Sequence, residues 1–115
     1  MRLRHLWLQP ALGIAGSADH SAWVIQSFRH KGLQRYFEHG SLGGIQPHHA
    51  KRLRVLLAAL ETATVIQDMD MQGFRLHSLK GSLTGRWSVW ISASWRLTFE
   101  FFEGDAFKVD YEDYH

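Results

Sequence analysis

The sequence predicts a small α+β domain in which two N-terminal helices pack on one face of a small antiparallel β-sheet. Two observations carry this prediction. The first half of the chain holds two segments whose apolar residues recur every three to four positions, and the second half holds segments in which apolar and polar residues alternate. With 115 residues, 45% of them hydrophobic, the chain has the size and composition of one domain with a single core.

The first predicted helix is short and follows an extended run. Residues 24–28 alternate in the manner of a β-strand. Leu33, Tyr36 and Phe37 then recur at the spacing of one helix face. Gly40 follows as a stop, because glycine readily ends a helix in the left-handed conformation. We therefore expect a short helix that turns its aromatic side towards the core.

The second predicted helix is longer and has two chemically different sides. Pro47 stands where a helix can start, and the helical pattern runs from His48 to about Thr64. Its apolar stripe consists of Leu53, Leu56, Leu57, Leu60 and Ala63. The basic residues that fall outside this stripe are Lys51, Arg52 and Arg54. This pattern predicts a helix with a basic outer surface.

The second half of the chain predicts consecutive strands. A β-type run between two glycines covers residues 74–80, and alternation follows at residues 87–92, 95–101 and 107–112. Residues 103–105 have the composition of a hairpin turn. Because the connections are short, the strands should form an antiparallel meander whose aromatic face the helices cover.

The other face of this sheet should be polar and open. Successive residues of a strand point to opposite faces, so Arg75 and His77 share one side, and Arg96 lies opposite the aromatic side of its strand. Trp90 also falls on the face of its strand that points away from the core, where it can stack on a base or meet a partner. The last residues, Glu112–His115, should lie beside this surface or at its end. We expect a concave, cationic face.

Such a face is chemically suited to cutting RNA without a metal. The 2′-OH of RNA is an internal nucleophile next to the scissile phosphate. A general base, a cation for the developing charge and a general acid for the leaving 5′-oxygen complete the reaction. Each residue also has a simpler interpretation: a structural His77, a stacked Arg96, a solvated turn Lys80 and a frayed tail. The residues alone leave the reaction open.

The charge distribution is uneven although the formal net charge is only +2. Residues 29–54 contain six Lys or Arg and one acid, whereas residues 97–115 contain one base and six acids. This asymmetry predicts either a polyanionic partner or two surfaces that pair with each other. The absence of cysteine excludes disulfides, thiolate metal sites and a cysteine nucleophile, and it fits a reducing cytosol.

Residues 1–23 differ from the rest of the chain. A basic start and a short apolar run imitate a secretory signal, but Gln9 and Pro10 interrupt the run. No run approaches the ~18 apolar residues that span a bilayer. We expect a flexible extension or residues that are not translated in the cell, followed by one domain over residues 24–115. An exported domain remains the alternative.

Several stretches, in order from Val24 to His115, resemble the HigB toxins of the RelE-like superfamily. They are residues 25–33, 44–53, 74–81, 87–89, 95–101, 104–106 and the terminal Tyr-Glu-Asp-Tyr-His at 111–115. The resemblance implies the RelE-like fold and a cytoplasmic type II toxin that cleaves mRNA codons, often adenine-rich ones, in the ribosomal A site. It also implies a HigA-type helix-turn-helix antitoxin as partner, contact with operator DNA only through that antitoxin, and neither a cofactor, a metal nor a membrane.

The resemblance also implies site residues. The catalytic positions match His77, Asp113, Tyr114 and His115, and the phosphate-binding positions match Lys80 and Arg96. We expect His115 or Asp113 to help activate the 2′-OH and His77 to act as acid or phosphate ligand. The residues expected to dock on ribosomal RNA are Lys51, Arg52 and Arg54.

The chain departs from the family at its start. Relatives begin with Met about where Val24 stands, and valine is what a GTG start codon would appear to encode. We therefore expect the natural protein to lack residues 1–23. The main functional alternative is a non-catalytic module of the same fold that binds antitoxin or nucleic acid.

Overall fold

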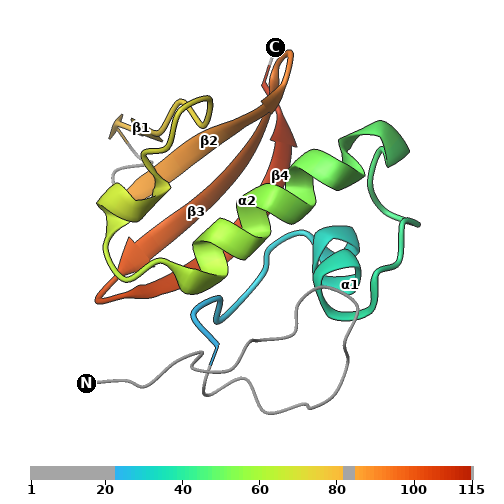
Figure 1. Ribbon diagram of the computed structural model, residues 1–115, viewed down its shortest axis with the longest axis horizontal. Helices are drawn as coiled ribbons and strands as arrows, with labels where there is room; N and C mark the ends of the chain where they lie inside the picture. Colours follow the sequence, from blue (N-terminus) through green and yellow to red (C-terminus); the bar gives the residue numbers. More distant parts are fainter. Residues whose placement is uncertain (1–22, 82–84, 115) are drawn as a thin grey trace.

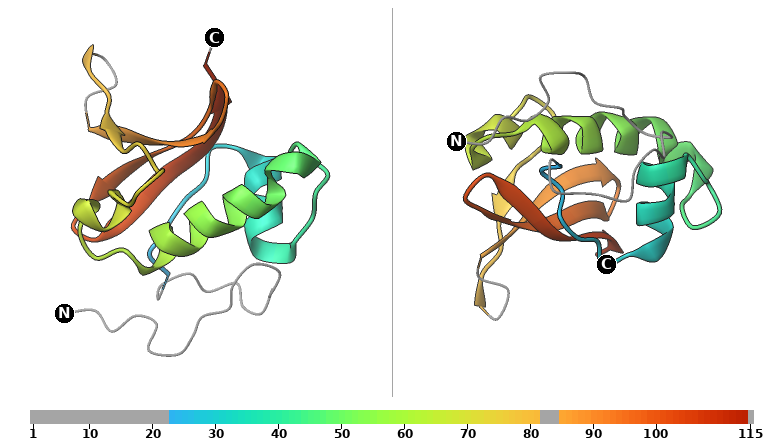
Figure 2. Two further views of the ribbon diagram at one scale, coloured as in Figure 1. Left: turned by 45° about the horizontal axis from the view of Figure 1, so that its top comes forward. Right: turned by 90° about the horizontal axis from the view of Figure 1, so that it is seen from below.

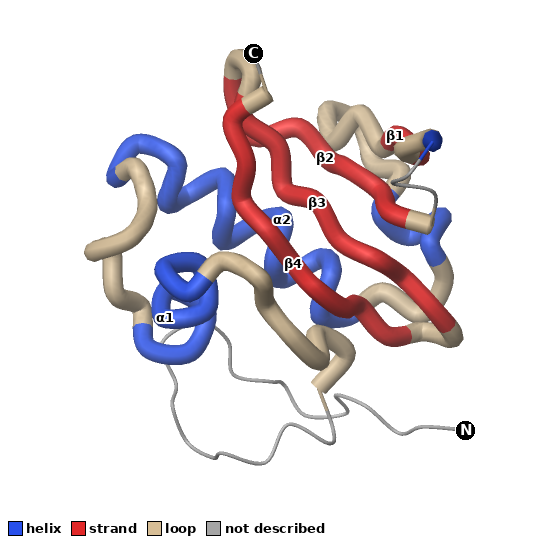
Figure 3. Tube along the Cα trace, turned by 180° about the vertical axis from the view of Figure 1, so that it is seen from behind, coloured by secondary structure: helices blue, strands red, loops and turns tan. Residues whose placement is uncertain are grey.

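The computed structural model describes residues 23–81 and 85–114. Within them the elements follow in the order α1 (Lys31–His39), η1 (Pro47–His49), α2 (Ala50–Thr62), η2 (Ile66–Met69), β1 (His77–Ser78), β2 (Arg86–Ser92), β3 (Trp95–Phe102) and β4 (Asp105–Asp113). The strands form one antiparallel sheet in the order β1-β2-β3-β4. Helix α2 lies across one face of the curved sheet with α1 beside it (Figures 1 and 2), and Figure 3 shows the open opposite face. The predicted α+β fold is confirmed.

Both predicted helices form and bury their apolar sides. His30 caps α1 by accepting a hydrogen bond from the backbone N–H of Leu33 at 3.0 Å. Gly40 ends α1 in the left-handed conformation with φ of 77° and donates to the carbonyl of Tyr36 at 2.9 Å. The leucines of the α2 stripe are fully buried: Leu53, Leu56, Leu57 and Leu60. The hydrophobic core therefore lies between α2 and the sheet.

The extended run at residues 24–28 forms two isolated bridges rather than a full strand. Ile25 bridges Ala106 and Phe28 bridges Val109, both in parallel orientation. The run thus covers the outer edge of β4, which would otherwise present unpaired backbone groups to other chains.

Two strands differ from the predicted pattern. The run at residues 74–80 yields only the two residues of β1, because Arg75 takes a left-handed φ of 53° that interrupts an extended backbone. In β4, Lys108 also has a positive φ, of 52°, and the pairing shifts there. This bulge adds one residue to the strand, so the residues beyond it point to the opposite face from the one that strict alternation predicts. Ala106 therefore takes the core position, and Phe107 pairs with Glu100 on the open face.

A close approach of two glycines joins α1 to the loop before α2. A Cβ on Gly32 would lie 2.7 Å from the Cα of Gly44, and one on Gly44 would lie 2.5 Å from the Cα of Gly32. Any larger residue would push the two segments apart.

The predicted N-terminal extension lies outside the described residues, apart from Trp23. Trp23 packs edge-on against Phe37 with ring centroids 5.5 Å apart. No helix in residues 23–81 and 85–114 is long and apolar enough to cross a membrane.

Candidate functional site

A pocket of about 420 Å³ opens on the face of the sheet away from the helices. Its lining residues are Arg75, His77, Leu79, Ser88, Arg96 and Tyr114. The pocket therefore lies between the β1 segment and the residue that follows β4, with β2 and β3 as its floor. Two arginines and a histidine are among the described residues that line it, and none of these residues is acidic.

The sheet register explains why these residues meet. His77 pairs with Ser88, which in turn pairs with Thr98 on β3. Residues paired across antiparallel strands point to the same face. The two small side chains in the middle, Ser88 and Thr98, are buried and leave the floor low beneath the larger groups around it.

Arg96 is anchored at the turn between β2 and β3. Its Nη1 donates to the carbonyls of Ala93 at 3.0 Å and Trp95 at 3.1 Å. Both bonds use the same nitrogen, and Nε and Nη2 have no hydrogen bond to the described residues, so these two nitrogens can contact an anion in the pocket. A guanidinium fork of this kind binds phosphate well.

Tyr114 lines the pocket beside the same turn between β2 and β3. Its backbone N–H donates to the carbonyl of Ser94 at 2.8 Å. Burial raises the pKa of its phenol, and the nearby carboxylate of Glu112 raises it further against the opposing effect of Arg86 and Arg96. The hydroxyl thus keeps its proton at neutral pH and can donate it.

Asp113 lies away from the pocket, although it is the neighbour of Tyr114. It pairs with Trp95, whose ring stacks on Tyr111 on the core side of the sheet, and its carboxylate accepts a hydrogen bond from the hydroxyl of Ser94. Burial lowers the pKa of the nearby His49 imidazole, and the charge of Asp113 opposes this shift only in part. Asp113 therefore fixes the end of β4 from the face opposite to Tyr114.

The other predicted residues are placed differently. Lys80 is exposed just after β1 and is not among the residues that line the pocket, and His115 lies outside the described residues. Lys51 and Arg54 are exposed on α2. Arg52 instead donates to backbone carbonyls of Gly73 and Trp90, and burial lowers its pKa. The structure thus brings His77, Arg96 and Tyr114 together and separates Asp113 and the α2 basic residues from them.

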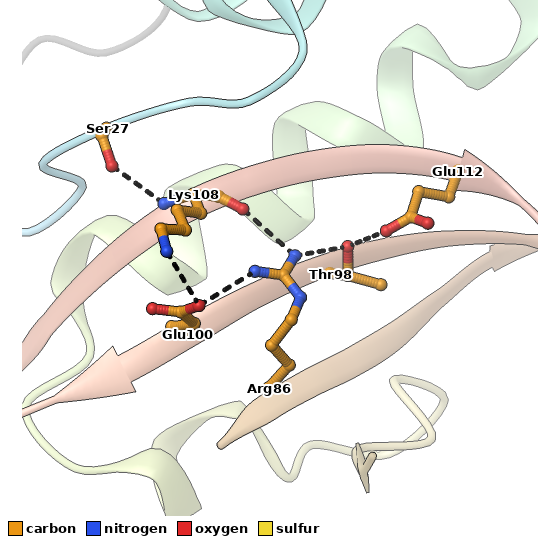
Figure 4. A network of polar contacts seen from close by, with 6 residues as sticks. All are labelled: Ser27, Arg86, Thr98, Glu100, Lys108 and Glu112. Atoms are coloured by element: carbon orange, nitrogen blue, oxygen red, sulfur yellow. Dashed lines mark hydrogen bonds and ion pairs between the residues drawn. The ribbon is translucent and has the colours of Figure 1, made fainter. Parts of the chain in front are cut away.

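A polar network continues from the pocket along the open face (Figure 4). Arg86 is 5% exposed and donates to the hydroxyl of Thr98 at 2.9 Å and the carbonyl of Lys108 at 3.1 Å. Its Nη1 lies 3.7 Å from the carboxylate of Glu100, which also lies 3.5 Å from the amine of Lys108. Thr98 donates to Glu112. This network stiffens the strands that carry Arg96 and Tyr114.

Sequence reasoning placed Arg75 on the side of His77 without naming it as a site residue, and it missed Arg86 on this surface. Alternation placed Arg75 on the same side as His77, but nothing in the local pattern linked it to the pocket. Arg86 lies two residues before Ser88, so both side chains point to the same face of β2, and this alternation was the signal that could have identified Arg86. Among the described residues, no three His, Cys, Asp or Glu side chains group as metal ligands do.

The α+β fold is consistent with that of a small toxin of the RelE-like type. The family model for the RelE-like toxin HigB of type II toxin-antitoxin systems matches residues 26–115. The endoribonuclease HigB of Proteus vulgaris is 45% identical over 92 residues, which cover 80% of this chain and all of that protein. The chain therefore belongs to the HigB family of RelE-like type II toxins, and the resemblance inferred from its sequence is confirmed.

Proposed function

We propose that this toxin is an endoribonuclease that cuts mRNA on the ribosome in the cytoplasm. The single observation that carries the proposal is one pocket lined by His77, Arg96 and Tyr114 on an otherwise open sheet face. The similar protein from Proteus vulgaris bears the name of an endoribonuclease, which supports the same reaction here. An antitoxin partner follows from the type II family.

The reaction is transesterification within the RNA. A base takes the proton of the 2′-OH, the 2′-oxygen forms a bond to phosphorus, and the bond from phosphorus to the 5′-oxygen breaks. An acid delivers a proton to the leaving 5′-oxygen, so that the products are a 2′,3′-cyclic phosphate and a free 5′-OH. Arg96 stabilises the charge on the pentavalent phosphate. The phenol of Tyr114 lines the pocket in its protonated form and is the proposed proton donor, although its raised pKa makes it a weaker acid than a free tyrosine. His77 contacts the phosphate or donates in its place. We retain His115 as the predicted base in preference to Asp113, whose carboxylate is engaged on the other face.

The test maps mRNA ends after purified toxin is added to translating ribosomes and, in parallel, to naked mRNA. We expect His77→Ala and Arg96→Ala each to lower the cleavage rate by about 100-fold or more. Deleting His115 should have a similar effect. Lys31→Ala, an exposed change on α1, serves as control and should cleave as the unmodified protein does.

Cleavage that survives both His77→Ala and Arg96→Ala would reject this site. A protein that binds its antitoxin but cuts no RNA in either arm would be the non-catalytic module instead. Equal cleavage of naked and ribosome-bound mRNA would reject the ribosome dependence alone. If naked mRNA is also cut, a chelator added to that arm tests whether the reaction needs a metal.

The exposed cations of α2 are the proposed docking surface. Lys51 and Arg54 are exposed, so each can contact a phosphate of ribosomal RNA and release a counterion. We expect Lys51→Ala and Arg54→Ala to weaken ribosome binding and to reduce its dependence on salt. Unchanged affinity in the double variant would contradict this assignment.

We also propose that residues 24–115 suffice for the activity. The family model starts at residue 26, and Glu61 accepts hydrogen bonds from the backbone nitrogens of Val24 at 3.3 Å and Ile25 at 3.1 Å. A chain that began at residue 24 would place its amino group beside this buried carboxylate. Such a chain should fold and cleave mRNA as the full chain does. Loss of its cooperative unfolding transition would contradict the proposal, and the intact mass of protein made from the native locus would show where translation starts.

A further inference from the structure

Arg75 is held in an unusual conformation at the rim of the pocket. Its φ of 53° is rare for a residue with a side chain and carries a conformational cost. Its guanidinium carbon lies 4.1 Å from the centroid of the Trp90 ring, which is within the range of a cation–π contact. The exposed side chain therefore rests on an aromatic ring and lines the pocket.

The ring beneath Arg75 is itself anchored. The indole N–H of Trp90 donates to the carbonyl of Ala93 at 3.0 Å, and this carbonyl also accepts a hydrogen bond from Arg96. The backbone N–H of Trp90 donates to the carbonyl of Phe74 at 2.8 Å, next to Arg75. One turn thus holds both the predicted phosphate ligand and the platform of Arg75.

The lining of the pocket divides into two kinds of surface. Arg96, His77 and Tyr114 supply hydrogen-bond donors and charge of the kind a phosphodiester needs. Arg75 supplies a guanidinium with one face on Trp90, and Leu79 supplies an apolar side chain. The volume of about 420 Å³ exceeds what a single phosphate group fills.

We propose that the Arg75–Trp90 stack forms a nucleobase subsite next to the scissile phosphate, in which a base of the RNA lies on the guanidinium of Arg75. Bases stack on arginine planes as they do on aromatic rings, and such contacts tolerate different sequences. The proposal rests on the proposed ribonuclease function, because it names where a nucleotide of that substrate binds.

The test uses binding rather than cleavage. The full chain is titrated with a 2′-O-methyl adenosine trinucleotide, which has no 2′-OH to react, and with the same backbone carrying abasic sites. NMR follows the indole N–H signals, and Trp90→Phe identifies the signal of Trp90. We expect this signal to shift when the trinucleotide is added. Arg75→Ala should weaken the affinity for the trinucleotide by about tenfold and leave the affinity for the abasic backbone unchanged. Arg75→Lys keeps the charge but loses the plane, so it should resemble Arg75→Ala.

Each outcome decides the matter. If Arg75→Ala weakens both oligonucleotides equally, or if Arg75→Lys binds as the unmodified protein does, Arg75 is a phosphate contact and the base subsite is rejected. Absence of any shift at Trp90 rejects it as well. Thermal unfolding confirms that the Arg75 variants are folded. The oligonucleotides cannot be cut, so the binding measurement does not depend on cleavage. A toxin that fails to cleave mRNA would therefore refute the proposed function without changing the outcome of the binding test.

Discussion

Replacing Arg52 with alanine should destabilise the fold even though Arg52 lies on the basic side of α2. Its Nη2 donates to the carbonyl of Gly73 at 2.7 Å and to that of Trp90 at 2.9 Å, and its Nε donates to the Trp90 carbonyl at 3.1 Å. Its guanidinium carbon also lies 5.3 Å from the Phe74 ring centroid. These contacts tie α2 to β2 and to the segment that leads into the pocket.

The magnitude follows from these contacts. Hydrogen bonds from a charged donor to two carbonyl groups are worth about 1 kcal/mol each when the site is partly exposed, and a cation–π contact adds roughly 0.5–1 kcal/mol. Arg52→Ala should therefore lower the free energy of unfolding by about 2–3 kcal/mol. For a domain of this size that corresponds to a fall in Tm on the order of 10 °C.

Chemical denaturation measures the change, and the neighbouring cations supply matched controls. Lys51→Ala and Arg54→Ala remove the same charge from exposed positions of the same helix, so their unfolding free energies should change by less than about 0.5 kcal/mol. If Arg52→Ala is no less stable than these two variants, the anchoring role inferred for Arg52 is wrong. In ribosome binding the order should reverse, because only Lys51 and Arg54 are exposed for phosphate contacts.

Two further predictions concern the pH and the glycine contact. His49 is 2% exposed with its Nδ1 2.7 Å from the hydroxyl of Tyr111, and burial lowers its pKa below the usual 6.5. Below about pH 6.5 the unfolded chain therefore binds more protons than the folded chain, so the free energy of unfolding should fall as the pH drops. Urea unfolding at pH 5.5 and 7.5 measures this fall, which should be smaller in His49→Gln. An equal fall in the variant and the unmodified protein would contradict the prediction. Gly44→Ala should lower the free energy of unfolding by about 1–3 kcal/mol, because its Cβ would lie 2.5 Å from the Cα of Gly32. In Gly43→Ala the nearest contact of the Cβ is at 3.6 Å, so this variant should be almost as stable as the unmodified protein. Thermal unfolding compares the two variants, and equal effects would refute the steric argument.

Much of the site could be predicted because the alternation of side chains between the two faces of a strand depends only on local sequence. Alternation alone put His77 and Arg96 on the face opposite the aromatic residues, and the pocket indeed has both in its lining. Alternation failed where the backbone left the extended region. The bulge at Lys108 moved Phe107 to the open face, and the left-handed Arg75 shortened β1. Positive φ values at residues other than glycine leave little trace in a sequence.

The sequence by itself determined the elements, their order, the face each residue takes on a regular strand and the family to which the chain belongs. These depend on periodicity and on short motifs, which are readable one segment at a time. Only the tertiary structure decided that Arg52 bonds to carbonyls, that Asp113 bonds to Ser94 and that Arg75 rests on Trp90. Such contacts join segments that are distant in the chain, and their partners are set by how the whole core packs.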